Sequence, residues 1–391
     1  MKRWIVVLLA TVLGMAAPAA QAETVKIGLL LPYSGVFARL AQTMDDAVKL
    51  WVKEHGDSVG GTKIEIIRRD TTGPKPEVAK RLAQELITRD HVNLLTGFVF
   101  TPNALAVAPL ATEAKMPTVI MNAATAVITT KSPYFTRVSL TLPQTTLIFG
   151  RWAATKGGMK RVYVAVSDYG PGYDAEASFK DGFTEAGGTV VGSVRFPLAN
   201  PDFAPFLQRV LDQKPDGLYA FIPGGSQPPA FVKAFHDLGL ARAHIRLMPS
   251  QEATDDADLQ NLGDLAVGIV TATNYSSARH SAANEKFVAA WHAAYGAHND
   301  PDFFAVGAWD GMALIDDVVR KLHGKIEGDR AMTVIKGWKH ESPRGPITID
   351  PETRDIIQNI YIREVKRGDD GELYNVELET FENVKDPVKA A

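Results

Sequence analysis

The sequence predicts an α/β protein with two doubly wound lobes. Short β-rich runs alternate with amphipathic helices in two series, and a linking segment, 139–144, separates the series. Such alternation is typical of parallel sheets that are covered by helices on both faces. The chain of 391 residues is also longer than one hydrophobic core usually serves, which favours two domains.

The first series begins after residue 22. Ile64 and Ile66 alternate with charged residues, which indicates a half-buried strand. Pro76 stands at a first helical position, and Val78, Leu82 and Leu86 recur every four residues, which predicts a helix packed on a sheet. The expected strands are 25–31, 63–68, 92–96 and 118–121, and the other expected helices are 38–54 and 102–114.

The second series repeats this order. Its expected strands are 161–166, 189–195, 217–221 and 245–248, and its expected helices are 175–186, 203–213 and 229–238. The remaining chain is expected to complete both lobes with a strand at 268–273, helices at 284–295 and 304–323, and a strand pair at 347–350 and 358–366. The polar end, 382–391, is expected to fray. Crossings between lobes near Thr141, Thr273 and Ser342 would form a hinge.

The N-terminus has the order of a secretory signal. Lys2 and Arg3 precede an apolar run, 4–15, and the segment closes on Ala20-Gln21-Ala22. We therefore expect a signal peptide at 1–22, cleaved after Ala22, and a protein located in a bacterial periplasm, with full secretion or an uncleaved anchor as alternatives. The chain has no cysteine, so it is not a lipoprotein and has no disulfide. The expected lobes are 23–141 plus 274–341 and 142–273 plus 342–391.

Composition and motifs argue against several classes of function. The net charge of −3 gives no electrostatic footprint for nucleic acid. The chain has no His-Glu-X-X-His, Gly-X-Ser-X-Gly or Walker motif, so we expect no enzyme, no metal site and no cofactor, although an enzyme built on dispersed residues stays an alternative. Asp255, Asp256 and Asp258 form an acidic cluster that we expect to be solvated.

The loops after the expected strands mix aromatic residues, hydroxyls and glycines, as small-molecule sites require. We expect Tyr33, Phe100 and Tyr169 to line a pocket, and Phe98 and Phe221 to lie in the core. Thr101 before Pro102 reads as a helix N-cap whose exposed amides can hold a carboxylate. Ordinary capping is the alternative.

The order of several motifs also resembles the branched-chain amino acid-binding family of periplasmic solute-binding proteins. The matching motifs are Val25-Lys26-Ile27-Gly28, Leu31-Pro32-Tyr33-Ser34-Gly35, Asn122-Ala123-Ala124-Thr125-Ala126, Asp168-Tyr169-Gly170 and Phe183-Thr184-Glu185-Ala186-Gly187-Gly188. The resemblance implies two Rossmann-like lobes (a type I periplasmic binding protein), a three-strand hinge and a ligand in the cleft between the lobes.

The resemblance also implies roles for single residues. The ligand carboxylate would meet amides and hydroxyls at Thr101, Ala123 and Thr125, and Tyr169 would cover the ligand. Ser226 joins the predicted ligand-binding set because of its place in the loop after the strand 217–221 and not because of the resemblance, and Gln251 and Glu252 complete the set. In amino-acid binders the loop 249–252 supplies an acidic residue that pairs with the ammonium group, but here the alignment places Gln251 at that position, with Glu252 next to it.

A neutral amide at position 251 cannot offset a desolvated ammonium group, so a cleft-facing Gln251 would favour a ligand without one. Ser342-Pro343-Arg344-Gly345-Pro346 resembles family members that bind lignin-type aromatic acids. We therefore predict a monomeric binding component that captures a small carboxylate, preferably a benzoate or cinnamate derivative, and delivers it to an ABC permease in the inner membrane. A branched-chain amino acid or amide binder, and a ligand-sensing component of a signalling system, are the alternatives.

Overall fold

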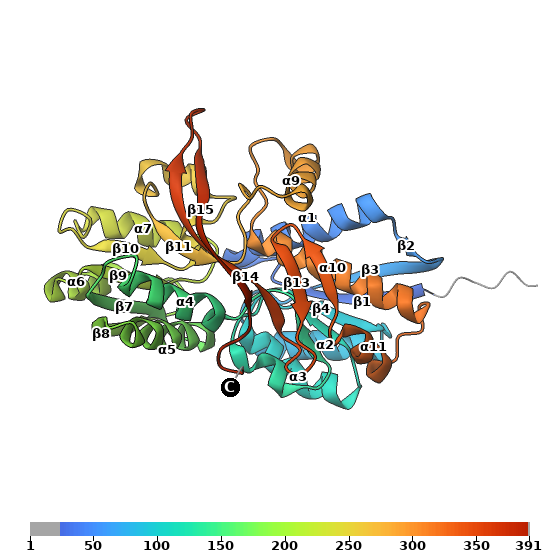
Figure 1. Ribbon diagram of the computed structural model, residues 1–391. Helices are drawn as coiled ribbons and strands as arrows, with labels where there is room; N and C mark the ends of the chain where they lie inside the picture. The colour runs from blue at the N-terminus through green and yellow to red at the C-terminus, as the bar shows by residue number, and fades with distance from the viewer. Residues whose placement is uncertain (1–23, 390–391) are drawn as a thin grey trace, which may run out of the picture.

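The computed structural model describes residues 24–389 and has two α/β halves, each built around its own parallel sheet (Figure 1). The predicted fold class is confirmed by this arrangement. The expected signal segment, 1–22, lies outside the described residues. Among residues 24–389, no helix has both the length and the apolar character that crossing a membrane requires.

The first sheet has the strand order β2-β3-β1-β4-β5-β6, in which only the β2–β3 pair is antiparallel. Helices α1 and α10 pack together over one face, and α2 and α3 cover the other. The strands are β1 (Thr24–Leu31), β2 (Ser58–Val59), β3 (Thr62–Asp70), β4 (Leu94–Gly97), β5 (Thr118–Ile120) and β6 (Phe135–Arg137). The helices are α1 (Ala38–His55), α2 (Pro76–Thr88), α3 (Thr101–Glu113), α9 (Ala282–Tyr295), α10 (Phe303–Leu322) and α11 (Gly328–Ile335).

The second sheet has the order β10-β9-β7-β8 and is parallel throughout. Helices α4 and α5 pack side by side on one face, whereas α6 and α7 cover the other. The strands are β7 (Arg161–Ser167), β8 (Thr189–Phe196), β9 (Gly217–Phe221) and β10 (Arg246–Pro249). The helices are α4 (Leu142–Ala154), α5 (Gly170–Glu185), α6 (Ala204–Gln213), α7 (Gln227–Asp237) and α8 (Leu259–Leu262).

A third, antiparallel sheet runs between the two halves. Strand β14 (Ile356–Arg367) pairs with β13 (Gly345–Ile349) at its start and with β11 (Val270–Thr273) further on. It also pairs with β15 (Leu373–Val384), and β12 (Lys339–Ser342) pairs with β13. In Figure 1 the red β14–β15 ribbon rises between the two halves.

The segments that connect the halves are hydrogen-bonded to one another. Gln358 Nε2 and Arg344 Nη1 both donate to the carbonyl oxygen of Ser139, at 2.9 and 3.0 Å. Asn274 Nδ2 donates to Gln358 Oε1 at 3.2 Å. The regions near Thr141, Thr273 and Ser342 therefore lie close together in the structure.

Two sequence predictions about the secondary structure were wrong. Part of the expected linking segment starts α4, which begins with a capping box between Thr141 and Gln144. The polar end was expected to fray, but β15 extends to Val384, Asp386 is buried, and Lys389 forms an ion pair with Asp355.

Candidate ligand-binding site

A narrow cavity of about 30 Å³ lies between the carboxyl ends of the two sheets. Its walls are mostly apolar, and the rings of Tyr169 and Phe221 are stacked with centroids 6.1 Å apart. A deeper compartment of about 10 Å³ shares Leu140, Leu142 and Glu252 with it and is also lined by Tyr219. The other residues that line the main cavity are Leu40, Val99, Phe100, Asn122, Ala124, Pro171, Pro223, Gly224, Phe303 and Phe304.

Glu252 lies deep in the protein and faces both compartments. Its side chain retains partial accessibility because it borders the cavity. Burial raises the pKa of this carboxyl group to about 7, although a hydrogen bond from Ser250 and the charge of Arg363 act in the opposite direction. Its Oε2 atom has no hydrogen-bond partner within the described residues.

On the opposite wall, Phe100, the residue directly before α3, lines the cavity. Gly97 permits the turn after β4, because its φ is +103° and a Cβ there would lie 2.5 Å from the Leu30 carbonyl oxygen. The helix begins at Thr101, one residue earlier than expected, and Phe100 is the N-cap. The first hydrogen bonds of the helix are donated by the amides of Asn103 and Ala104 to the Phe100 carbonyl oxygen. The amide of Thr101 comes before these donors, so it has no partner inside the helix.

Thr101 and Thr125 are brought together but do not line the cavity. Their hydroxyl oxygens are 2.7 Å apart, and both side chains are buried. Gly170, the first residue of α5, covers them from the second half, where a Cβ would lie 3.0 Å from Thr125 Oγ1. The Ala126 amide also donates to Asp174 Oδ2 of α5 at 2.7 Å. These contacts join the two halves beside the cavity.

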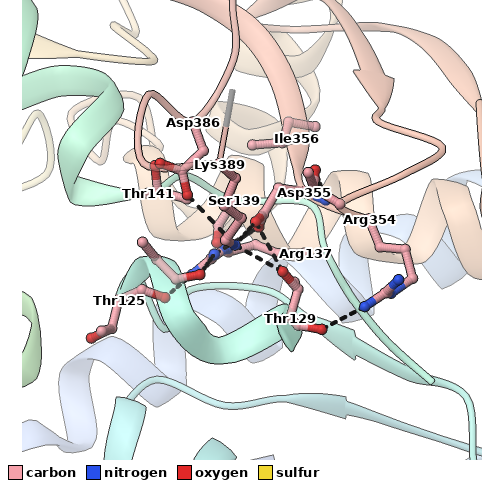
Figure 2. Close-up of polar contacts among 12 residues, drawn as sticks. Thr125, Thr129, Arg137, Ser139, Thr141, Arg354, Asp355, Ile356, Asp386 and Lys389 are labelled. Atoms are coloured by element: carbon pink, nitrogen blue, oxygen red, sulfur yellow. Dashed lines mark hydrogen bonds and ion pairs between the residues drawn. The ribbon is translucent and has the colours of Figure 1, made fainter. Parts of the chain in front are cut away.

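The loop that carries Ala123 and Thr125 is held by Arg137 (Figure 2). Arg137 Nη1 donates to the carbonyl oxygens of Ala123 and Thr125 at 2.9 and 2.8 Å. Its Nε donates to Asp355 Oδ1 at 2.7 Å, and Asp355 also pairs with Lys389. Since Arg137 and Asp355 are almost wholly buried, this network fixes the loop from behind the cavity.

The remaining predicted site residues lie at different distances from the cavity. Ala123 is buried next to the lining residues Asn122 and Ala124. Gln251 lines the deeper compartment, where its Oε1 atom accepts a hydrogen bond from Thr273. Tyr33 and Ser226 are not lining residues of either compartment.

Tyr33 and Ser226 lie in different surroundings. Tyr33 lies beside Asp45, and burial together with the charge of Asp45 raises the pKa of its hydroxyl. Ser226 is exposed at the start of α7. Phe221 is buried as expected, but it also lines the cavity.

Several lining residues were not predicted from the sequence because they do not follow a strand. Leu40 belongs to α1, Leu142 begins α4, and Phe303 and Phe304 begin α10. One signal was available for the last pair, because Asp302 directly before them caps α10 by accepting a hydrogen bond from the Ala305 amide at 2.8 Å. Neighbouring aromatic residues at a helix start can face the same cavity as the strand ends.

The acidic cluster was expected to be solvated, and this prediction was wrong. Asp255 and Asp256 are buried, and Asp256 Oδ2 accepts a hydrogen bond from Arg363 Nη1 at 2.8 Å. Arg39 of α1 pairs with Asp258 and lies 3.9 Å from Asp255. The cluster therefore provides a charged contact between α1 and the loop after β10.

Two facing α/β halves with an aromatic-walled cavity at the carboxyl ends of their sheets define a two-lobed small-molecule binding protein. The family model described as "Periplasmic binding protein" matches residues 24–372, and the chain belongs to this family. This membership confirms the resemblance to periplasmic solute-binding proteins that the sequence motifs predicted.

The similar proteins include one that is named after branched-chain amino acids and two that were solved with aromatic acids. A "Leu/Ile/Val-binding protein homolog 6" from Brucella melitensis is 44% identical over 376 residues, which cover 96% of each chain. A solute-binding protein of an ABC transporter from Rhodopseudomonas palustris BisB5, solved with 3,4-dihydroxybenzoic acid, is 50% identical with a TM-score of 0.90, and the match covers 94% of this chain and 99% of that one. A second R. palustris solute-binding protein, solved with 4-hydroxybenzoate, is 42% identical with a TM-score of 0.91. The match covers 94% of this chain and 100% of that one.

Proposed function

We propose that this protein is the periplasmic solute-binding component of an ABC importer and that it captures a small aromatic carboxylate. The observation that carries the proposal is the aromatic-walled cavity between the carboxyl ends of the two sheets, because open parallel sheets bind their ligands at that edge. The two R. palustris proteins that were solved with hydroxylated benzoic acids support the same ligand class.

In this proposal the first half binds the carboxylate and the second half covers the ring. The Thr101 amide and the adjoining loop of Ala123 and Thr125 provide the polar end, where the helix dipole of α3 favours an anion. Tyr169 and Phe221 provide an aromatic wall. A permease in the inner membrane would then receive the ligand, and the protein itself would act as a monomer without catalysis.

We further propose that the lobes are 23–141 plus 274–341 and 142–273 plus 342–391, and that the crossings near Thr141, Thr273 and Ser342 act as the hinge. The contacts of Gly170 and Asp174 with the first half are those expected of a closed arrangement. Family membership supports export, and cleavage of a signal peptide after Ala22 remains part of the proposal.

The test is a thermal-shift screen of the mature protein with benzoate, 4-hydroxybenzoate, 3,4-dihydroxybenzoate, leucine, isoleucine and valine. A ligand at 100 times its dissociation constant adds about 2.7 kcal/mol of stability. We expect stabilisation by the aromatic acids, confirmed by titration calorimetry. Stabilisation by the amino acids alone would contradict the aromatic assignment.

Branched-chain amino acid binding is the second candidate because of Glu252. Gln251 lines only the deeper compartment and is hydrogen-bonded to Thr273, whereas Glu252 also faces the main cavity, so the site offers a ligand a carboxyl group as well as a neutral amide. A carboxylate there can pair with an ammonium group. The name of the Brucella relative favours the same candidate, and the leucine arm of the screen distinguishes the two.

A further inference from the structure

The two ends of the cavity differ in their unsatisfied polar groups. At the first-half end, Phe100, the N-cap residue of α3, lines the cavity, and the amide of the next residue, Thr101, has no partner inside the helix. In the deeper compartment the polar side chains Thr145 and Thr146 both donate to the Leu142 carbonyl oxygen, at 3.0 and 2.8 Å. Gln251 is likewise engaged by Thr273. These side chains are therefore occupied within the protein.

Two lining groups have buried polar atoms without a partner in the described part of the chain. These atoms are Glu252 Oε2 and the hydroxyl oxygen of Tyr219. The two groups lie close enough for the charge of Glu252 to raise the pKa of Tyr219, in addition to the larger effect of burial. An acceptor and a hydroxyl thus stand together at the end of the cavity remote from α3.

A phenolic hydroxyl matches this pair because it can donate one hydrogen bond and accept another. We propose that Glu252 is a specificity-determining residue that selects aromatic acids with a hydroxyl opposite the carboxylate, by accepting the hydrogen bond of that hydroxyl, with Tyr219 as the neighbouring donor. This inference rests on the proposed function. It gives Glu252 a role different from pairing with an ammonium group.

The physical basis is the cost of an unsatisfied buried group. A ligand without the hydroxyl excludes water from Glu252 and Tyr219 but offers no partner in its place, whereas a hydroxylated ligand satisfies both. A hydroxyl adjacent to the carboxylate would remain at the α3 end and would bring no such gain.

The experiment measures dissociation constants of the mature protein for benzoate, 2-hydroxybenzoate, 4-hydroxybenzoate and leucine by titration calorimetry. We expect 4-hydroxybenzoate to bind about 10- to 100-fold more tightly than benzoate, since hydrogen bonds to charged groups have this strength. We expect 2-hydroxybenzoate to bind no better than benzoate. In Glu252→Met, which retains length but has no strong acceptor, the preference for 4-hydroxybenzoate should fall below about 3-fold.

Several variants keep the inference testable. Glu382→Gln, at an exposed glutamate of β15, is the control and should retain the full preference. Tyr219→Phe should reduce the preference without abolishing benzoate binding, and it serves as the second variant if Glu252→Met does not fold. Thermal unfolding of each unbound variant establishes that it is folded.

Three outcomes would overturn the inference. The wild-type protein could bind benzoate and 4-hydroxybenzoate equally, the preference could survive in Glu252→Met, or leucine could bind and lose its affinity in that variant. If no aromatic acid binds to the wild-type protein, the proposed function itself fails, and this result is distinct from a lost preference among acids that do bind.

Discussion

Replacement of Glu252 by glutamine is expected to stabilise the unbound protein above pH 7 and to have little effect below pH 4.5. Burial raises the pKa of this carboxyl group from 4.5 to about 7. Between these values the folded protein retains a proton that the unfolded chain has released, so the stability of the wild-type protein decreases as the pH rises through this window. At 1.36 kcal/mol per pKa unit, the loss reaches at most about 3 kcal/mol.

This loss is large enough to measure. For a chain of this size the unfolding entropy is roughly 0.8 kcal/mol/K, so about 3 kcal/mol corresponds to a difference of about 4 °C in Tm. Differential scanning calorimetry of ligand-free wild type and Glu252→Gln from pH 4.5 to 8.5 gives the comparison, with Glu382→Gln as the control. Parallel Tm curves for wild type and Glu252→Gln would refute the reasoning.

Three other substitutions test the contacts around the cavity. Arg39→Ala removes a partly exposed ion pair between the halves and is expected to weaken ligand binding about 2- to 5-fold, less at high salt, by titration calorimetry. Gly170→Ala places a Cβ 3.0 Å from Thr125 Oγ1, so we expect about 10-fold weaker binding, while unfolding of the unbound protein is unchanged. Arg137→Met removes the buried partner of Asp355 and is expected to lower the unfolding free energy by about 3 kcal/mol in urea titrations.

Each of these substitutions has its own control. Arg89→Ala breaks only two surface pairs within one half, with Glu85 and with Asp90, and should leave affinity unchanged. Adding Thr125→Ala to Gly170→Ala removes the oxygen that the new Cβ contacts and should restore the ligand affinity. If the affinity is not restored, the contact between residues 170 and 125 does not limit closure of the two halves. An Arg137→Met protein as stable as Arg151→Met, which removes an exposed pair, would contradict the role of the buried network.

The repeating strands and helices could be predicted because their periodicity is strong. Helix α4 could not, since its buried residues include Thr145 and Thr146, which satisfy their hydroxyls on the helix backbone and leave no clear polar stripe. Strand β15 was missed for the opposite reason. Tyr374, Val376 and Leu378 do alternate with polar residues, but most side chains of β15 are exposed or half-buried, so this alternation does not mark a buried face.

The loops at the carboxyl ends of strands could be predicted as the site because parallel sheets place these ends at one edge. The side chains that reach the cavity depend on details that a sequence does not contain. Thr101 and Thr125 have the hydroxyls expected of anion ligands, but these hydroxyls bond to each other beneath α5. Contacts made across two lobes have no local sequence signal.

Gln251 and Glu252 illustrate the smallest such detail. Both begin the short 3₁₀ helix Gln251–Thr254, where three residues make one turn and successive side chains therefore point about 120° apart. Gln251 is hydrogen-bonded to Thr273, whereas Glu252 faces the main cavity. An alignment that matches the loop but shifts by one residue exchanges a neutral amide for a carboxyl group at the cavity wall. Because that group bears on the choice between a ring hydroxyl and an ammonium group, the ligand class depends on the direction of one side chain.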